Sequence, residues 1–289
     1  MSKASAAYSV DTGVNDDNVF HLYAYSAVAE GVEGFEGIRD EDVEFYREQG
    51  YLVVRRAFSP QQVQDALDGI TDLIAGKYPD FKGIQFAPEV RDRIDSLTFE
   101  ERYDSIRKLH AFLPFEARLR AICFDPRLMA TLERLLGAPA QLYENDGQAH
   151  LKPPKIGREK PWHQDHAYFN LPVGTPIVGV WIALDETGPE NGCMHVIPGS
   201  HKEGPVVHFK RRDWQICDTS VEVARCVAAP MKPGDLLFFD GLIHHGTPPN
   251  RSEKRRRALQ FHYHPKGVGA ITTEERLAVF GSEGKDVTC

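Results

Sequence analysis

Two histidines and an aspartate lie close together in the segment KPWHQDHAYF: His163 and Asp165 are separated by one residue, and His166 follows directly. In an extended strand, residues two apart lie on the same face, so His163 and Asp165 would be side by side with Gln164 facing away. Such a pair can bind a divalent metal ion, and a third ligand would complete the two-histidine, one-carboxylate set of non-haem iron(II) oxygenases. The alternative is a polar strand on which Asp165 is only the hydrogen-bond partner of His163.

A second stretch, GDLLFFDGLIHHGTPPNRSEKRRRALQFHYH, offers the third ligand. An apolar run at 234–239 leads to His244 and His245, with Thr247 two residues after His245 and Arg256 eleven after it. A dicarboxylic cosubstrate that chelates iron at one end needs a fixed cation at the other, and the planar guanidinium group suits this role. The histidines could instead stand at a loop tip, and Arg256 could belong to a solvated charge run. The order and spacing together favour a metal site.

The elements that would position these residues are β-strands. From about residue 141 onward, short apolar runs such as VGVWIAL, CMHVIPG and ALQFHYH are separated by Gly, Pro and Asn-Gly. This pattern is typical of an antiparallel barrel or sandwich. The fold class expected is mainly β with α, in which N-terminal helices pack on a β core.

The helices are predicted upstream of this core. An amphipathic helix carrying Val43 and Tyr46 should end at Gly50, followed by the β-type run YLVV. A second helix should begin with Ser59 as its cap and Pro60 at its first position. Residues 99–136 are also predicted to be helical. Residues 1–37 are small, acidic and polar, and we expect a flexible extension there, followed by one domain over 38–289.

The composition excludes several classes of protein. The chain has 289 residues and a formal net charge of −8, which argues against general nucleic-acid binding. It contains no apolar run of about 18 residues and no secretory signal at its start, so we expect no membrane span. The five cysteines include no CxxC pair and are interpreted as reduced thiols, which indicates the cytoplasm.

Taken together, these motifs resemble the phytanoyl-CoA dioxygenase family of iron(II)- and 2-oxoglutarate-dependent oxygenases. The resemblance runs from about Asp42 to His264. It includes GYLVV, IRKLHAF, KPP ten residues ahead of WHQDHAYF, GVWIALDETGPENGCMHVIPGSHK, GDLLFFDGLIHHGT and RRALQFH. The resemblance implies a double-stranded β-helix, or jelly roll, with Fe(II), 2-oxoglutarate and O2 as reactants.

The resemblance also implies roles for individual residues. His163, Asp165 and His245 correspond to the iron ligands, with His245 preferred because it lies eleven residues after Gly234, as in the family pattern. The residues that correspond to 2-oxoglutarate contacts are Arg256, Thr247, Lys108, Gln148 and Trp181. Of these, Lys108 could also be a surface lysine and Trp181 a core aromatic residue.

The reaction type expected from the resemblance is hydroxylation of a small molecule with release of succinate. Relatives that halogenate carry Ala or Gly in place of the carboxylate ligand, whereas this chain has Asp165. The candidates for contact with the substrate are His150, Trp162, His166, Phe169, Asp240 and His262. For each of them taken singly, packing in the barrel or at its rim is the more ordinary interpretation.

The substrate itself is less defined. Seven basic residues suggest an anionic substrate, although they could form a solvated loop: Lys152, Lys155, Arg158, Lys160, Lys210, Arg211 and Arg212. Two other functions stay open, a cupin-like metal enzyme that does not use 2-oxoglutarate and a non-catalytic barrel that has kept its ligand residues. The pair of Arg256 and Thr247 argues against the cupin-like enzyme, and the intact set of three ligands together with Arg256 argues against the non-catalytic barrel.

Overall fold

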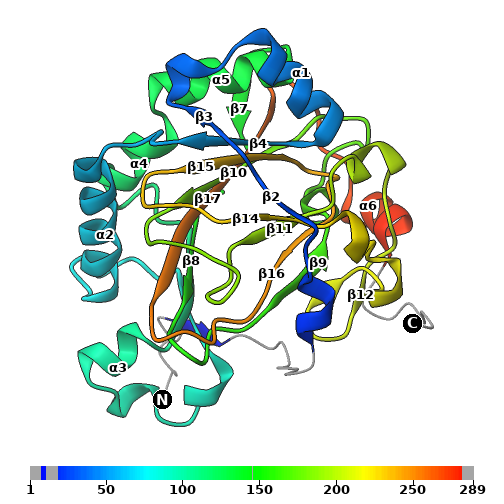
Figure 1. Ribbon diagram of the computed structural model, residues 1–289. Helices are drawn as coiled ribbons and strands as arrows, with labels where there is room; N and C mark the ends of the chain where they lie inside the picture. The colour runs from blue at the N-terminus through cyan, green and yellow to red at the C-terminus, as the bar shows by residue number, and fades with distance from the viewer. Residues whose placement is uncertain (1–7, 11–18, 145, 282–289) are drawn as a thin grey trace.

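The computed structural model describes residues 8–10, 19–144 and 146–281, and two β-sheets dominate it (Figure 1). In the larger sheet the strand order is β1-β5-β6-β8-β17-β10-β15-β4-β3, with β7 also paired to β17. Its strands are β1 (Tyr8–Val10), β3 (Val32–Glu33), β4 (Tyr51–Arg55), β5 (Ile84–Phe86), β6 (Ile106–His110), β7 (Ala140–Leu142), β8 (Gln148–Lys152), β10 (Val178–Ala183), β15 (Leu236–Asp240) and β17 (Arg256–Pro265).

The smaller sheet has the order β2-β14-β11-β16-β9, and it supplies two strands that carry the predicted metal ligands. Its strands are β2 (Ala27–Val28), β9 (Lys160–His163), β11 (Met194–Val196), β14 (Val227–Ala229) and β16 (His245–Thr247). A separate two-stranded ribbon pairs β12 (Phe209–Lys210) with β13 (Trp214–Gln215).

Among the residues that the structure describes, six α-helices accompany the sheets: α1 (Asp40–Gln49), α2 (Pro60–Ile74), α3 (Phe99–Tyr103), α4 (Ala117–Cys123), α5 (Pro126–Leu136) and α6 (Thr273–Phe280). Helices α1, α2, α4 and α5 lie along the outer side of the larger sheet (Figure 1). Leu128 and Ile70 from these helices share one buried core with Val180 and Phe261 from the sheet.

Strand alternation explains why the barrel has an interior separate from the helical layer. On β10, Val178 and Val180 pack toward the helices, whereas Trp181 and Ala183 point into the space between the two sheets. Burial of a large apolar side chain contributes about 1.5–3 kcal/mol. Both faces of β10 are buried, so a shift of one residue in register would place each set of side chains in the core shaped for the other, and this mismatch fixes the register.

The predicted helix boundaries are confirmed where the capping residues marked them. Helix α1 ends at Gly50, whose φ of 80° is left-handed and favours glycine. Helix α2 begins at Pro60, and the Ser59 side chain accepts a hydrogen bond from the Gln62 backbone amide.

The prediction of a continuous helical region over 99–136 is wrong in its middle. Residues Ile106–His110 form β6, which pairs with β5 and β8. The pairing energy of two neighbouring strands outweighs the helical tendency of this short segment. Lys108 is consequently part of the barrel wall, paired with His150.

The predicted extension of residues 1–37 contributes to the fold where it is described. A 3-10 helix at Val19–Tyr23 packs on Trp162, and β2 pairs in parallel with β14. The expectation of loose structure therefore does not hold for residues 19–37, while residues 1–7 and 11–18 lie outside the described residues. The division of the chain into an extension and a domain from residue 38 stays a prediction.

Three cysteines in the described part of the chain follow the expectation of reduced thiols. Cys123, Cys193 and Cys226 are free and buried. In the part of the chain that the structure describes, no helix has the length and apolar character needed to cross a membrane.

Candidate metal centre

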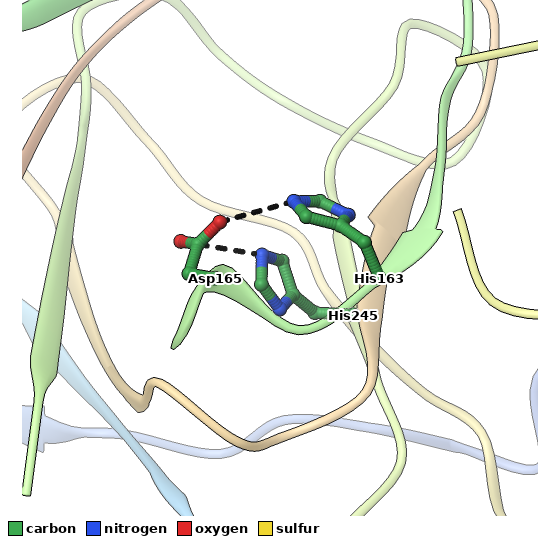
Figure 2. A group of neighbouring side chains, drawn as sticks. All are labelled: His163, Asp165 and His245. Carbon is green, nitrogen blue, oxygen red and sulfur yellow. Dashed lines mark hydrogen bonds and ion pairs between the residues drawn. The ribbon is translucent and has the colours of Figure 1, made fainter. Parts of the chain in front are cut away.

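Two neighbouring strands and the turn after one of them bring three potential metal ligands together. His163 is the last residue of β9, and it pairs directly with His245, the first residue of β16. Asp165 begins the 3-10 turn that follows β9. One ligand atom from each of these three buried residues lies within 4.8 Å of the others (Figure 2). The structure thus brings together the three residues that the sequence predicted as ligands.

Gln164 separates the first two ligands as the strand pattern predicted. Its backbone is extended, with φ −115° and ψ 127°. Its side chain donates to the backbone carbonyls of Gly204 and Leu242, away from the centre. His163 and Asp165 are therefore left on the same side of the chain.

The hydrogen bonds of the two histidines prepare them as metal ligands. Nδ1 of His163 donates to the Pro161 carbonyl at 2.7 Å, and Nδ1 of His245 donates to the Ile243 carbonyl at 3.0 Å. Because a carbonyl can only accept, each ring carries a proton on Nδ1, and the neutral ring has its lone pair on Nε2. Both Nε2 atoms face Asp165, at 3.1 Å and 3.5 Å from its two carboxylate oxygens (Figure 2).

This arrangement fits a metal ion better than a set of hydrogen bonds. Burial, followed by the neighbouring His245 and Lys160 side chains, lowers the pKa of His163 to about 4, so the His163 ring is neutral near pH 7. A neutral Nε2 and a carboxylate oxygen both present lone pairs to each other. A divalent cation bound by all three residues satisfies these lone pairs, and the donor set of two nitrogens and one oxygen suits iron(II).

A second layer of residues, formed by His262, Gln260 and Asp146, holds the Asp165 carboxylate in place. Oδ2 of Asp165 accepts hydrogen bonds from Nε2 of His262 at 2.6 Å and from Nε2 of Gln260 at 3.0 Å. On its other side, Nδ1 of His262 donates to Asp146 at 2.9 Å. Burial alone would lower the pKa of His262. The carboxylates of Asp146 and Asp165 outweigh this effect and raise the pKa to about 10. The position of Asp165 is thereby fixed, with Oδ1 directed toward His163.

A cavity of about 360 Å³ lies next to the three ligands, and the predicted cosubstrate residues line it. Arg256 is only 2% exposed, and its Nε and Nη1 atoms have no hydrogen-bond partner. The guanidinium carbon lies 5.4 Å from the centre of the Trp181 ring. The hydroxyl of Thr247, also buried, has no hydrogen-bond partner either.

The electrostatics of Arg256 point to an anionic ligand. Burial lowers the pKa of this guanidinium to about 9, because no carboxylate contacts it. A buried charge without a partner is strongly unfavourable, and such charges in proteins are normally paired. A carboxylate bound in the cavity would supply the missing partner for Arg256 and for the Thr247 hydroxyl.

Lys108 and Gln148 also line the cavity. Burial, with Lys160 and Arg107 nearby, lowers the pKa of Lys108 to about 8. The amide of Gln148 donates to Asp146 at 3.1 Å, so this residue also supports the second layer around the carboxylate.

The six predicted substrate contacts divide into two groups. His150, Phe169 and His262 line the cavity. The Nε2 atom of His150 is buried without a hydrogen-bond partner, whereas His262 is engaged by two carboxylates. Contact of His150 and Phe169 with a substrate stays a prediction, since the structure shows only that they line the cavity.

The other three candidates lie outside the cavity lining, and their assignment as substrate contacts is not supported. Trp162 donates its indole N–H to the Leu22 carbonyl in a separate apolar cluster. His166 donates to the Leu171 carbonyl, because the 3-10 turn directs it away from the metal ligands. Asp240 accepts from the Leu242 backbone at the end of β15.

Sequence reasoning missed two residues of the second layer. Gln260 lies on β17 at an even spacing from Arg256, so strand alternation could have identified it. Asp146 lies between β7 and β8, and no local signal marks it, because its role depends on β17 being beside it.

Known proteins share sequence similarity with most of this chain. Residues 46–258 match the sequence profile of the family described as Phytanoyl-CoA dioxygenase (PhyH). A probable phytanoyl-CoA dioxygenase of Caenorhabditis elegans is 26% identical over 236 residues, covering 77% of this chain and 74% of that protein. A methylphosphonate hydroxylase of Gimesia maris is 25% identical over 242 residues, covering 82% of this chain and 85% of that protein.

Solved structures confirm the fold. The α-ketoglutarate-dependent carbocyclase SnoK from nogalamycin biosynthesis superposes with a TM-score of 0.66 at 22% identity, covering 89% of this chain and 98% of that one. The epimerase SnoN, solved with Fe3+, α-ketoglutarate and nogalamycin RO, gives a TM-score of 0.62 at 20% identity, covering 86% of this chain and 91% of that one. The jelly-roll architecture predicted from the sequence is therefore confirmed.

Proposed function

Since the chain belongs to the phytanoyl-CoA dioxygenase (PhyH) family, whose structural neighbours are iron- and 2-oxoglutarate-dependent oxygenases, we propose that it hydroxylates a small organic molecule with release of succinate and CO2. The observation that carries this proposal is the unpaired, buried Arg256 in the same cavity as His163, Asp165 and His245.

In this proposal each metal ligand has a defined task. His163 and His245 bind iron(II) through Nε2, while the Pro161 and Ile243 carbonyls hold the rings in the required tautomer. Asp165 contributes Oδ1, because His262 and Gln260 occupy Oδ2. Three ligands leave coordination positions for the cosubstrate and O2.

The remaining residues bind and orient the cosubstrate. Arg256 and Thr247 hold the far carboxylate of 2-oxoglutarate, with Trp181 against the guanidinium group. Lys108 and Gln148 complete the wall on the side of β6 and β8. Iron held by His163, Asp165 and His245 would supply the activation of O2, with 2-oxoglutarate as the electron donor, and the protein's own residues would orient the cosubstrate.

Hydroxylation is proposed over other outcomes of the same chemistry. Asp165 is present, so a halide has no vacated carboxylate position at the metal. The Gimesia maris relative is named as a hydroxylase, whereas solved neighbours include a carbocyclase and an epimerase. We favour hydroxylation because it requires no specialised substrate geometry beyond placing a C–H bond near the metal.

The alternatives account less well for the site. A cupin-like metal enzyme without 2-oxoglutarate would have no use for an unpaired buried arginine beside the metal. A non-catalytic barrel would have no reason to keep the second layer of His262 and Asp146 around a metal ligand. We propose one catalytic domain over residues 38–289 and a cytoplasmic location, although several mammalian relatives are named as peroxisomal.

The proposal is tested by adding iron(II) and 2-oxoglutarate to the protein without oxygen. We expect the weak visible charge-transfer band of the iron–2-oxoglutarate complex in the wild-type protein, and its loss in His163→Ala and Asp165→Ala. His201→Ala is the control, because this histidine contacts the Arg47 carbonyl outside the cavity. If the folded wild-type protein shows no band, the proposed function is refuted.

A further inference from the structure

Gln164, the residue between two of the metal ligands, is hydrogen-bonded to two other segments of the chain. It is fully buried, and its backbone N–H donates to Nε2 of His208 at 2.9 Å. Its side-chain nitrogen donates to the carbonyls of Gly204 at 2.9 Å and Leu242 at 2.8 Å. Its side-chain oxygen accepts from the backbone N–H of Val206 at 2.8 Å. Rotation of this residue would leave several buried polar groups unpaired, so these bonds fix its conformation.

The imidazole of His208 is prepared to accept the hydrogen bond from Gln164. Its Nδ1 donates to the Val206 carbonyl at 2.8 Å, which places the proton on Nδ1 and leaves the lone pair on Nε2. Burial lowers the pKa of His208 to about 3, so the ring is neutral near pH 7. The backbone N–H of His208 donates to the carbonyl of Phe280, the last residue of α6, at 2.6 Å. Helix α6 therefore supports the position of this histidine.

The segment 197–208, which contains His208, also holds the neighbour of the third ligand. His244 directly precedes His245, and its backbone carbonyl accepts from the N–H of Ile197 at 2.9 Å. The backbone N–H of His244 donates to the Ser200 hydroxyl at 2.8 Å. No residue of 197–208 lines the cavity. The segment thus binds the residues next to all three ligands from outside the space that a cosubstrate or substrate would occupy.

Strand pairing alone does not fix the position of Asp165. Strands β9 and β16 pair at His163 and His245, so the ladder fixes these two ligands relative to each other. Strand β9 ends at His163, and Asp165 lies in the turn beyond it. The direction of Asp165 relative to His163 therefore depends on the φ and ψ of Gln164. Since a metal site needs its ligands in place to within about 0.5 Å, the hydrogen bonds of Gln164 bear directly on metal binding.

We propose that Gln164 and His208 are positioning residues of the metal centre, which hold Asp165 in the orientation that directs Oδ1 toward the two histidines. This inference rests on the proposed function, because it takes His163, Asp165 and His245 as the metal ligands. Neither positioning residue touches the metal or the cosubstrate. Their contribution is to order the carboxylate before the metal binds, which lowers the entropic cost of binding.

The first test compares two replacements of His208 by titration of the full-length protein with Co(II). His208→Leu removes the acceptor for the Gln164 N–H, whereas the side-chain oxygen of His208→Gln can accept in place of Nε2. We expect His208→Leu to weaken Co(II) binding about tenfold and to alter the visible absorption spectrum of the bound ion. His208→Gln should keep most of the affinity and the wild-type spectrum. Both variants lose the ring contacts with Trp214 and Phe280, so their difference isolates the acceptor.

The second test replaces the amide of Gln164 and compares it with another buried amide. Gln164→Met keeps the length of the side chain without its hydrogen bonds, and it should weaken Co(II) binding about tenfold to a hundredfold. Asn191→Leu is the matched control. Asn191 is buried, accepts from the Gly188 N–H and donates to the Glu186 carbonyl within one turn. This control should lose stability in urea but keep the Co(II) affinity and spectrum of the wild-type protein.

The outcomes distinguish this inference from the proposed function. If the iron–2-oxoglutarate band forms in the wild-type protein but folded His208→Leu binds Co(II) as the wild-type does, the positioning role is refuted while the oxygenase assignment stands. The same holds if His208→Gln loses as much affinity as His208→Leu, or if Asn191→Leu loses as much as Gln164→Met. Should His208→Leu not fold, the comparison of Gln164→Met with Asn191→Leu decides the question. Absence of both the band and Co(II) binding in the wild-type protein refutes the proposed function, and the inference with it.

Discussion

Replacement of Arg256 by methionine should raise the stability of the free protein and weaken the binding of 2-oxoglutarate. In the free protein this guanidinium is buried, and its Nε and Nη1 atoms have no partner. Burial lowers its pKa from 12.5 to about 9. At 1.36 kcal/mol per pH unit, this lowering corresponds to roughly 5 kcal/mol of unfavourable free energy for the charged side chain. Methionine has a similar length and no charge, so it removes this cost while keeping the contact with Trp181.

We therefore expect Arg256→Met to be more stable than the wild-type protein when no ligand is bound. Solvent that enters the cavity recovers part of the unfavourable free energy, so the expected gain is about 1–3 kcal/mol. At about 2–4 °C per kcal/mol for a protein of this size class, the midpoint of thermal unfolding should rise by several degrees.

The effect on 2-oxoglutarate should have the opposite sign. Loss of one partner from a buried charge pair costs about 2–5 kcal/mol, which raises the dissociation constant from about thirtyfold to several thousandfold. Wild-type protein with metal, at a cosubstrate concentration one hundred times the dissociation constant, should gain about 2.7 kcal/mol of stability. Arg256→Met should lose this gain at the same concentration while keeping its metal content.

Calorimetry and thermal unfolding, each with and without 2-oxoglutarate, measure both effects. The neighbouring Arg255→Met is the matched control, because Arg255 is ion-paired with Asp104 and Glu100 outside the cavity lining. This control should lose up to about 1 kcal/mol of stability and keep its cosubstrate affinity. The reasoning is wrong if Arg256→Met is less stable than the wild-type protein and is still stabilised by 2-oxoglutarate.

Two further predictions concern the surroundings of the metal. His262→Gln should weaken Co(II) binding about tenfold to a hundredfold in a spectroscopic titration, because it removes support from the carboxylate ligand. His264 contacts the Pro265 carbonyl instead, so the control variant His264→Gln should bind Co(II) as the wild-type protein does. Equal Co(II) affinities of the two variants would contradict the role of His262. Gly179→Ala should lower the free energy of unfolding in urea by about 1–3 kcal/mol, since a Cβ there would lie 2.2 Å from the buried Phe239 ring. Gly174→Ala, with open space around it, is the control, and similar stability of the two variants would contradict this packing argument.

Local patterns in the sequence predicted the candidate metal ligands together with Arg256 and Thr247, whereas the other cosubstrate candidates came from the family resemblance. The spacing of His163 and Asp165 predicted that they lie on the same side of the chain. This holds because an extended residue places its two neighbours on one side, and Gln164 is extended. The same alternation along β17 places Arg256 at the cavity wall. Helix ends at Gly50 and Ser59 were predictable because capping depends on a few adjacent residues.

Two predictions, for His166 and for the segment 106–110, did not match the structure. In each case the local conformation depends on the next turn or on a neighbouring strand. His166 follows Asp165 directly, but the 3-10 turn after β9 directs it away from the centre. Residues Ile106–His110 form a strand because β5 and β8 flank them, which no pattern within that segment records.

The sequence by itself thus determined the types of ligand, their order along the chain and the alternating faces of the strands. Only the tertiary structure decided that His245 pairs with His163, that Asp146 meets His262, and that Arg256 is buried without a partner. The physical reason is that alternation and capping are set by neighbouring residues, whereas pairing, burial and charge balance arise between segments far apart in the chain. The chemistry of this site was therefore evident from the sequence, and the unbalanced charge that points to its ligands appeared only in the folded barrel.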